Sequence, residues 1–168
     1  MKLVANEDEK AFGILLGRYT GKAGSMAARI VGEKEAQDVT QEAFLKVWNL
    51  ASSFKEDGNF KAWLYRIIYN LAIDNYRKNS KEVGNLDEET PDSSLNFSHT
   101  LEMKDFAEKA LSHLPARQKA ALQLCYMEGY SQQEAADIMG TTVSALETLL
   151  FRGRQSVKSL VLRKLKEQ

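Results

Sequence analysis

The sequence is poor in the residues that several classes of protein require. It has one cysteine, Cys125, and two histidines among 168 residues, which excludes a disulfide framework and leaves too few ligands for a cysteine–histidine zinc site. No apolar run reaches the ~18 residues of a membrane-spanning helix, and the acidic start, MKLVANEDEK, lacks the apolar segment of a secretory signal. We therefore expect a cytoplasmic protein without membrane insertion.

Residue patterns typical of enzymes are missing as well. The sequence has no metal-ligand spacing and no glycine-rich phosphate loop, and neither histidine is paired with a nucleophile. Cys125 lies in an apolar segment with Leu122 and Leu124, which favours a core position over a reactive one. We expect no catalytic residues, no metal and no other cofactor.

Net charge is also absent, because 23 lysines and arginines balance 23 aspartates and glutamates. A neutral total argues against a nucleic-acid partner, but the charge is segregated. Residues 60–81 carry five bases and one acid (+4), residues 82–108 eight acids and one base (−7), and residues 144–168 six bases and two acids (+4). Such blocks are typical of interaction surfaces, although solvated helix faces give the same pattern.

The acidic block coincides with a segment that has no helical periodicity. Residues 82–100, EVGNLDEETPDSSLNFSHT, are rich in Asp, Glu, Ser and Asn, a composition typical of linkers. Outside this segment, apolar residues recur with the 3.6-residue period of helices. The sequence predicts an all-α fold of two small helical domains, residues 1–81 and 102–168, joined by a flexible acidic linker, residues 82–101.

Four helices are predicted in the N-terminal domain, over roughly residues 7–20, 22–31, 34–51 and 59–78. The third has a core-facing apolar stripe, which consists of Val39, Ala43, Val47 and Leu50. Its opposite face carries Asp38, Gln41, Glu42, Leu45 and Asn49. The apolar Leu45 within this polar face is either an ordinary exposed leucine or part of a partner surface.

The fourth predicted helix combines aromatic, amide and basic side chains. Its core stripe is Leu64, Ile67, Ile68 and Leu71, and its other side carries Trp63, Arg66, Asn70 and Arg77, flanked by Tyr65, Tyr69 and Tyr76. Single-stranded nucleic acid binds such surfaces, because rings stack on unpaired bases and cations neutralise phosphates. The preceding loop, from Phe54 to Phe60, is suited to hold one flipped base. Alternatively, the rings are core aromatics and the cations only solubilise the helix.

The C-terminal domain carries the signals of a helix-turn-helix. An amphipathic helix over residues 102–113, with Phe106, Ala110 and Leu114 inward, precedes a helix that Pro115 starts and Gly129 ends. Ser131 and Glu134 form an S-x-x-E capping box, Gly140 ends the short helix that follows, and a second helix begins after Thr142.

The second helix of this motif has a polar, basic outer face. Val143, Leu146 and Leu150 face inward, whereas Ser144, Thr148, Arg152 and Gln155 face outward, with Glu147 and Phe151 at the margins. Ser144 and Thr148 are placed to read base edges, Glu147 to accept from cytosine N4, and Arg152, Arg154 and Lys158 to contact phosphates or a guanine. An αα-hairpin that forms a dimer is the alternative.

Three blocks of the chain together resemble a bacterial sigma factor of the extracytoplasmic-function (ECF, group 4, sigma-70) type. They are QDVTQEAFLKVW (37–48), NFKAWLYRIIYNLAIDNYRK (59–78) and LPARQKAALQLCYMEGYSQQEAADIMGTTVSALETLLFRGR (114–154). They cover nearly the whole chain in the family's order. The resemblance implies a two-domain helical protein that docks on RNA polymerase core, through the β′ clamp helices and the β flap, and directs it to promoters. It also implies an anti-sigma partner.

The resemblance assigns three candidate sites. The clamp-helix segment corresponds to Asp38, Gln41, Glu42 and Leu45. The region that melts and recognises the −10 element corresponds to Phe54, Asn59, Phe60, Trp63, Arg66, Asn70, Asp74, Arg77 and Lys78. The −35 helix-turn-helix corresponds to Ser131, Gln132, Ser144, Glu147, Thr148, Phe151, Arg152 and Arg154. Many members have Arg or Lys where this chain has Glu147, so its −35 sequence cannot be taken from relatives.

The predicted linker is long enough for this task. Residues 82–101 span at most about 65–70 Å when extended, which is close to two turns of duplex. Two other functions fit parts of the sequence: a stand-alone helix-turn-helix regulator, which needs no elaborate N-terminal domain, and a sigma-like decoy that sequesters an anti-sigma factor. A decoy needs none of the cations Arg66, Arg77, Arg152 and Arg154.

Overall fold

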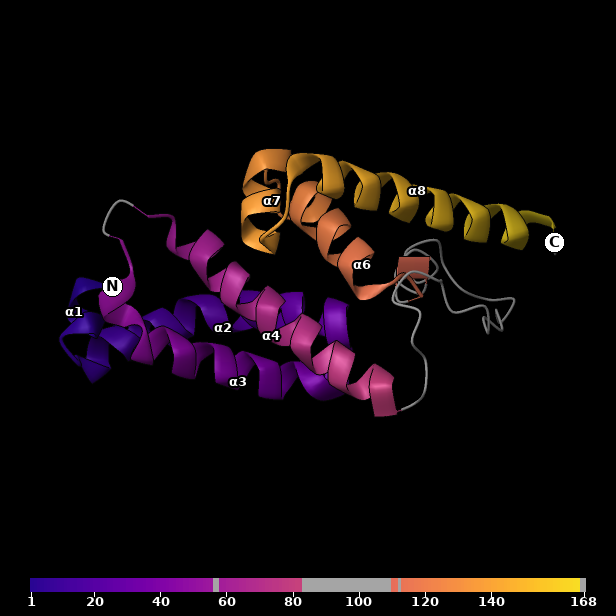
Figure 1. Cartoon of the computed structure of the whole chain (residues 1–168). Coiled ribbons are helices and arrows are strands. Elements are labelled where there is room, and N and C mark those ends of the chain that lie inside the picture. Colours follow the sequence, from indigo (N-terminus) through magenta and orange to yellow (C-terminus); the bar gives the residue numbers. More distant parts are fainter. Residues whose placement is uncertain (56–57, 83–109, 112, 167–168) are drawn as a thin grey trace.

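The computed structural model describes residues 1–55, 58–82, 110–111 and 113–166, and all regular structure within them is helical (Figure 1). This confirms the predicted all-α class. The predicted linker beyond Glu82 and most of the predicted helix 102–113, with Phe106, lie outside the described residues. In chain order the elements are α1 (Lys2–Ala5), α2 (Glu9–Val31), α3 (Glu33–Asn49), the 3₁₀ turn η1 (Ala51–Ser53), α4 (Phe60–Glu82), α6 (Ala116–Leu122), the π-helical turn η2 (Gln123–Met127), α7 (Gln132–Met139) and α8 (Val143–Lys166).

The N-terminal half is a bundle of the three long helices α2, α3 and α4, which all pack against one another. The two helices predicted over residues 7–20 and 22–31 are one helix, so the predicted break is wrong. Gly21 makes no turn, and a Cβ placed there would meet nothing within 4 Å. A glycine inside a helix costs only about 1 kcal/mol, which the packing of Met26 and Ile30 in the core outweighs.

Gly32 joins α2 to α3 without an intervening loop. Its φ of +92° lies in a region that residues with a side chain disfavour. Gly32 is both the C-cap of α2 and the N-cap of α3. The predicted stripe of α3 is confirmed at Val39, Ala43 and Val47, but Leu50 is 45% exposed. Leu50 ends the helix, so its direction no longer follows the helical period, and the buried residue of the next turn is Ala51.

In the C-terminal half, from Pro115 onward, the helices begin and end at the predicted residues. The α6 helix widens into the π turn η2 and ends at Gly129, whose φ is +73°. Helix α7 has the predicted capping box and ends at Gly140 in the left-handed conformation. Gly153 lets α8 approach α6, because a Cβ there would lie 2.9 Å from Leu122 Cδ1.

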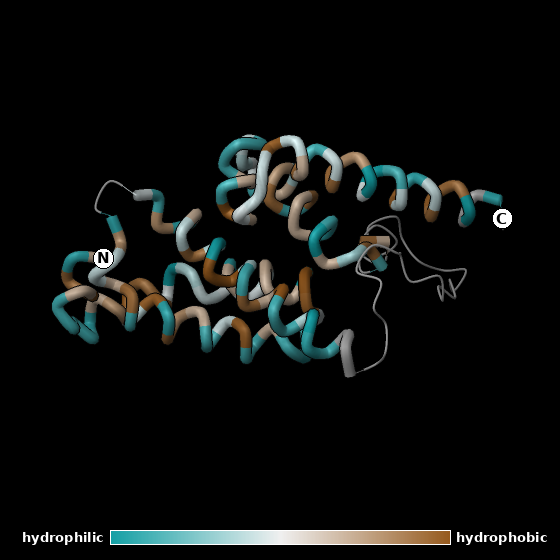
Figure 2. Tube along the Cα trace, in the orientation of Figure 1, coloured by the Kyte–Doolittle hydropathy of each residue, from teal (hydrophilic) through white to brown (hydrophobic). Residues whose placement is uncertain are grey.

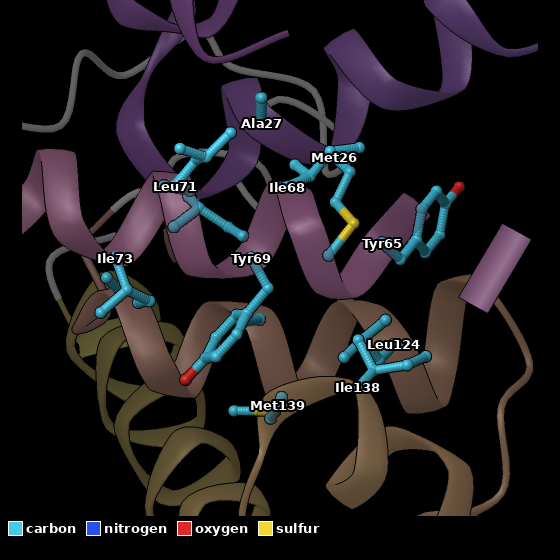
Figure 3. Packing of buried hydrophobic residues seen from close by; sticks show 14 of the residues in the cluster. Met26, Ala27, Tyr65, Ile68, Tyr69, Leu71, Ile73, Leu124, Ile138 and Met139 are labelled. Atoms are coloured by element: carbon cyan, nitrogen blue, oxygen red, sulfur yellow. The ribbon is translucent and has the colours of Figure 1, made fainter. Parts of the chain in front are cut away.

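The two halves share one hydrophobic core. Helix α4 lies between them: Ile68 and Leu71 pack toward α2, whereas Tyr69 extends toward Met139 of α7 (Figure 3). Tyr65 and Tyr69 are 0% and 4% exposed. Of the two alternatives for the tyrosines of α4, the structure therefore confirms the core position for these two, because the C-terminal half covers them.

Hydrophilic and hydrophobic residues alternate along the helices, as amphipathic helices require (Figure 2). Across the described residues, no helix combines the length and the apolar composition that a membrane crossing needs. Nor do the described histidine, cysteine, aspartate and glutamate side chains form a group of three that could hold a metal ion.

Candidate nucleic-acid interface

Three aromatic side chains gather where the loop before α4 meets the helix. The centroid of the Phe54 ring lies 5.9 Å from that of Phe60 and 5.2 Å from that of Trp63. The centroids of the Phe60 and Trp63 rings are 6.1 Å apart. Tyr19 of α2 supports Phe60 edge-to-face at 4.9 Å. All three rings are half-buried, so each presents part of its surface to solvent and is fixed by its neighbours. We call Phe54, Phe60 and Trp63 the aromatic cluster.

Two residues of the loop fix the geometry of this cluster. The Asn59 side-chain oxygen accepts a hydrogen bond from the Ala62 amide at 3.2 Å, which caps α4. Asn59 thus has a structural task besides its predicted contact with DNA. At Gly58 a Cβ would lie 2.9 Å from the Lys55 carbonyl oxygen and 3.3 Å from the Phe54 ring, so only glycine fits without a shift.

The polar residues predicted for the −10 element form one exposed stripe beyond the cluster. It follows the helical spacing of α4 and consists of Arg66, Asn70, Asp74, Arg77 and Lys78. The structure thus brings together all nine residues that the sequence singles out for this region, with the rings at one end and the cations along the helix.

The face of α3 is exposed at all four positions singled out for polymerase binding, Asp38, Gln41, Glu42 and Leu45. Leu45 is 64% exposed, and no described side chain covers it. Beside it, Lys46 Nζ lies 3.8 Å from Glu42 Oε1 in a solvent-facing pair. An exposed leucine within a polar stripe is therefore a feature of the folded molecule.

In the helix-turn-helix, α7 starts with the complete capping box. The Ser131 hydroxyl donates to Glu134 Oε2 at 2.7 Å, the Ser131 amide donates to the same oxygen at 2.9 Å, and the hydroxyl oxygen accepts from the Glu134 amide at 3.3 Å. These hydrogen bonds from Ser131 lower the pKa of the Glu134 carboxyl, so it stays ionised. Ser131 therefore holds the helix start, while the neighbouring Gln132 side chain is exposed.

Five of the residues predicted to contact the −35 element share one exposed face of α8: Ser144, Glu147, Thr148, Phe151 and Arg152. Phe151 is 57% exposed, an unusual position for a phenylalanine without a partner surface. The Thr148 hydroxyl donates to the Ser144 carbonyl at 3.0 Å, which leaves the oxygen lone pairs of Thr148 as acceptors.

Arg154 does not join this face. Its Nη1 donates to the Tyr126 hydroxyl at 2.6 Å, which turns the guanidinium toward η2. There it lines a cavity of about 990 Å³ between the two halves, together with Arg29 of α2 and Lys119 of α6. Burial lowers the pKa of the Lys119 ammonium.

One group of interacting side chains was not predicted from the sequence; it joins α4 to the turn before α7. Lys61, Tyr65, Glu128 and Tyr130 meet there, although more than sixty positions separate the first pair from the second. A signal existed in Tyr65 and Tyr69, four residues apart, which form an aromatic stripe beside the core stripe of α4. Such a stripe means that α4 is buried on two sides.

These features define a class of protein: an all-helical DNA-binding chain with an aromatic–basic helix face and a separate helix-turn-helix. Comparison with known families agrees, because residues 15–82 match Sigma-70 region 2 and residues 107–157 match Sigma-70, region 4. The ECF RNA polymerase sigma-E factor of Escherichia coli (strain K12) is 31% identical, over 94% of this chain and 90% of that protein. That of Haemophilus influenzae is 27% identical, over 94% and 91%.

Two solved structures have the same fold. The sigma factor RpoE, in complex with the anti-sigma factor NepR from Bartonella quintana, has a TM-score of 0.70 and 28% identity, over 90% of this chain and 97% of that one. CnrH, in complex with the cytosolic domain of CnrY, has a TM-score of 0.65 and 28% identity, over 95% and 93%.

The chain belongs to the ECF sigma factors of the sigma-70 family. It directs transcription initiation by RNA polymerase. Sigma factors are non-catalytic subunits of the polymerase, so the chain is not an enzyme. Because both regions match in order, the stand-alone helix-turn-helix regulator is set aside.

Proposed function

We propose that this sigma factor divides promoter recognition between two surfaces that differ in chemistry. The aromatic cluster and the stripe of α4 open the −10 element, and the exposed face of α8 reads the −35 element as duplex. The observation that carries the proposal is the aromatic cluster, whose three half-buried rings lie beside an exposed amide and exposed cations.

Opening DNA requires free energy but no chemical catalysis. Flipping a base out of the stack costs a few kcal/mol, and stacking one base on an aromatic side chain returns about 1–3 kcal/mol. Rings already fixed against one another lose little conformational entropy on binding. Asn70 lies on α4 two turns beyond Trp63 and can hydrogen-bond a captured base, while Arg66, Arg77 and Lys78 neutralise phosphates.

Polymerase holds the two surfaces at promoter spacing in this proposal. Each surface offers few cations, so the free protein binds DNA weakly. When polymerase holds both surfaces, binding of one DNA element raises the effective concentration of the other element at its surface. We assign the exposed α3 face around Leu45 to the β′ clamp helices, because an isolated leucine among charges fits an apolar groove with a polar rim. The C-terminal half contacts the β flap.

An anti-sigma factor is the regulatory partner that we propose, as in the complex of the sigma factor RpoE with NepR. The cavity between the halves supports this. Its lining includes the buried Ile30 and Leu122, and the basic side chains that line it, among them Arg29, Arg154 and Lys158, outnumber the one acidic side chain, Glu33. An amphipathic segment with acidic residues fits such a site.

The test is the double variant Trp63→Ala/Asn70→Ala. It should bind polymerase core as the wild type does but form open complexes at least about 10-fold more slowly, because a stacking ring and a base partner are gone. Open complexes are measured by the fluorescence of a base analogue in the −10 element. Asn79→Ala, an exposed amide farther along α4, is the matched control. Normal opening by the double variant would refute the proposal.

A further inference from the structure

Tyr19 reaches the aromatic cluster from another helix, α2. Its ring meets the Phe60 ring edge-to-face, with the centroids 4.9 Å apart and the planes at 69°. The Phe60 ring in turn lies 5.9 Å from the centroid of Phe54 and 6.1 Å from that of Trp63. Through this contact the cluster extends into the N-terminal bundle.

The core of the bundle fixes the position of Tyr19. Tyr19 lies one helical turn before Ala23, which is fully buried, and α2 packs against both α3 and α4. The Tyr19 ring is itself half-buried against this core. A tyrosine side chain has only two torsion angles to fix, so a ring packed in this way keeps its orientation at little entropic cost.

Phe60, in contrast, is the first residue of α4. The amides of the first helical turn have no partner within the helix, so the chain is less constrained there than in the helix interior. The Asn59 side chain caps the Ala62 amide but does not touch the Phe60 ring through this hydrogen bond. An edge-to-face contact is favourable beyond the area that it buries. A ring fixed in the bundle thus orients a ring at the start of a helix.

A second aromatic pair on α2 has nearly the same geometry but does not include a ring of the cluster. The Phe12 ring meets the Trp48 ring edge-to-face, with the centroids 5.0 Å apart and the planes at 61°. Phe12 lies two turns before Tyr19 on α2, and Trp48 belongs to α3. All four rings of the two pairs are half-buried. We therefore expect the two pairs to stabilise the fold about equally.

We propose that Tyr19 is a positioning residue for base capture, which holds Phe60 in the orientation that the aromatic cluster presents to a flipped base. The inference rests on the proposed opening of the −10 element by this cluster. Tyr19 acts through Phe60 and does not itself contact DNA. Rings that are fixed before binding lose less conformational entropy when a base stacks on them, so the contact with Tyr19 favours capture.

Opening of the −10 element by the holoenzyme tests this role. Tyr19→Leu removes the ring but keeps an apolar side chain, and it should slow opening about 2- to 10-fold, the contribution of one aromatic pair. Tyr19→Phe keeps the ring and should open promoters at the wild-type rate. Both variants should bind polymerase core as the wild type does. Base-analogue fluorescence in the −10 element reports the rate.

Phe12→Leu is the matched control, because it removes the other ring pair of α2. It should lower the midpoint of thermal unfolding about as much as Tyr19→Leu does, by about 2–4 °C, without slowing opening. Equal slowing by the two leucine variants would overturn the role of Tyr19, since a general loss of stability would then explain the effect. Normal opening by Tyr19→Leu, or slow opening by Tyr19→Phe, would overturn it as well.

The orientation of the Phe60 ring can be measured without DNA or polymerase. In the free, full-length protein with 4-fluorophenylalanine at position 60, Tyr19→Leu should move the fluorine resonance toward that of a solvent-exposed ring, whereas Phe12→Leu should leave it in place. An unmoved resonance in Tyr19→Leu would contradict the positioning. If Trp63→Ala/Asn70→Ala opens promoters normally, the proposed function fails, while the fluorine resonance still decides whether Tyr19 orients Phe60.

Discussion

The two surfaces assigned to DNA differ in how far they are buried. On α4, the rings of Phe54, Phe60 and Trp63 are half-buried and lie within about 6 Å of one another, at 5.2–6.1 Å. On α8, Ser144, Glu147, Thr148, Phe151 and Arg152 stand exposed on one face.

The difference fits the task that we propose for each surface. A flipped base needs a pocket formed in advance, because stacking must offset unpairing at once. A duplex already presents its base edges in the groove, so reading it requires only side chains that project from a helix held at the right angle. Half-buried rings thus suit the proposed opening surface on α4, and fully exposed side chains suit the proposed reading surface on α8.

The largest effect is expected beneath the reading surface. Leu146 is fully buried under α8, so Leu146→Ala should lower the free energy of unfolding by about 2–5 kcal/mol. The neighbouring Ser144→Ala, on the exposed face, should change it by less than about 0.5 kcal/mol. Denaturant titration measures both. A cost below 1 kcal/mol for Leu146→Ala would mean that the reading surface does not depend on the core under it.

Specificity should respond next. A carboxylate only accepts hydrogen bonds, whereas an amide also donates. Glu147→Gln should therefore change the binding free-energy difference between bases at one −35 position by about 1–3 kcal/mol. Binding of the holoenzyme to a library randomised in the −35 element gives this preference. Opening of pre-bound promoters should be unaffected. An unchanged base preference would show that Glu147 does not contact a base of the −35 element.

Preorganisation of the opening surface is tested at Gly58. The added methyl of Gly58→Ala collides with the Lys55 carbonyl and the Phe54 ring. It should raise the activation free energy of promoter opening by about 1–2 kcal/mol, which slows opening by a factor of about 5–30. The control is Gly21→Ala, where the methyl enters open space. Base-analogue fluorescence in the −10 element reports the rate. Equal rates would show that the cluster need not be formed in advance.

The smallest effect at neutral pH is expected at Tyr130, whose buried hydroxyl has no hydrogen-bond partner among the described residues. Tyr130→Phe should change the free energy of unfolding by less than about 0.5 kcal/mol near pH 7. Burial, and then Glu128, Glu134 and Tyr19, raise the pKa of Tyr130 from 10 to about 12. The folded protein therefore keeps this proton more firmly than the unfolded chain.

Its contribution to stability is complete below pH 10 and is lost as the pH rises toward 12. The variant should consequently lose stability less steeply over this range. Tyr65, whose pKa burial and Glu128 also raise, remains in the variant and retains part of the slope. Denaturant titration at several alkaline pH values measures the slope, and identical slopes for variant and wild type would contradict the assignment.

Much of the fold was predictable because its signals are local. The capping box of Ser131 and Glu134, the stop at Gly140 and the inward Leu146 and Leu150 are all confirmed. Each depends on residues three or four positions apart, which the helical repeat relates directly. The exposure of Leu45 follows in the same way, although its role in polymerase binding stays a prediction.

The errors lie where a local signal was weak or irrelevant. Gly21 lies between two predicted helices, but the free-energy cost of one glycine inside a helix is smaller than the stabilisation from the core that the continuous helix forms. Leu50 continues the stripe of α3 in sequence, yet the helix ends there. Asn59 also caps α4, and its contact with DNA stays a prediction.

The order of the amino acids is enough to specify the helices, their caps, the helix-turn-helix and the segregated charge, because each depends on neighbouring residues. The packing of the helices, in contrast, accounts for the burial of Tyr65 and Tyr69, for the turn of Arg154 toward Tyr126 and for the contact of Glu128 with Lys61. The Tyr65–Glu128 hydrogen bond joins residues 63 positions apart. No periodicity relates such positions, since only the packing of complete helices brings them together.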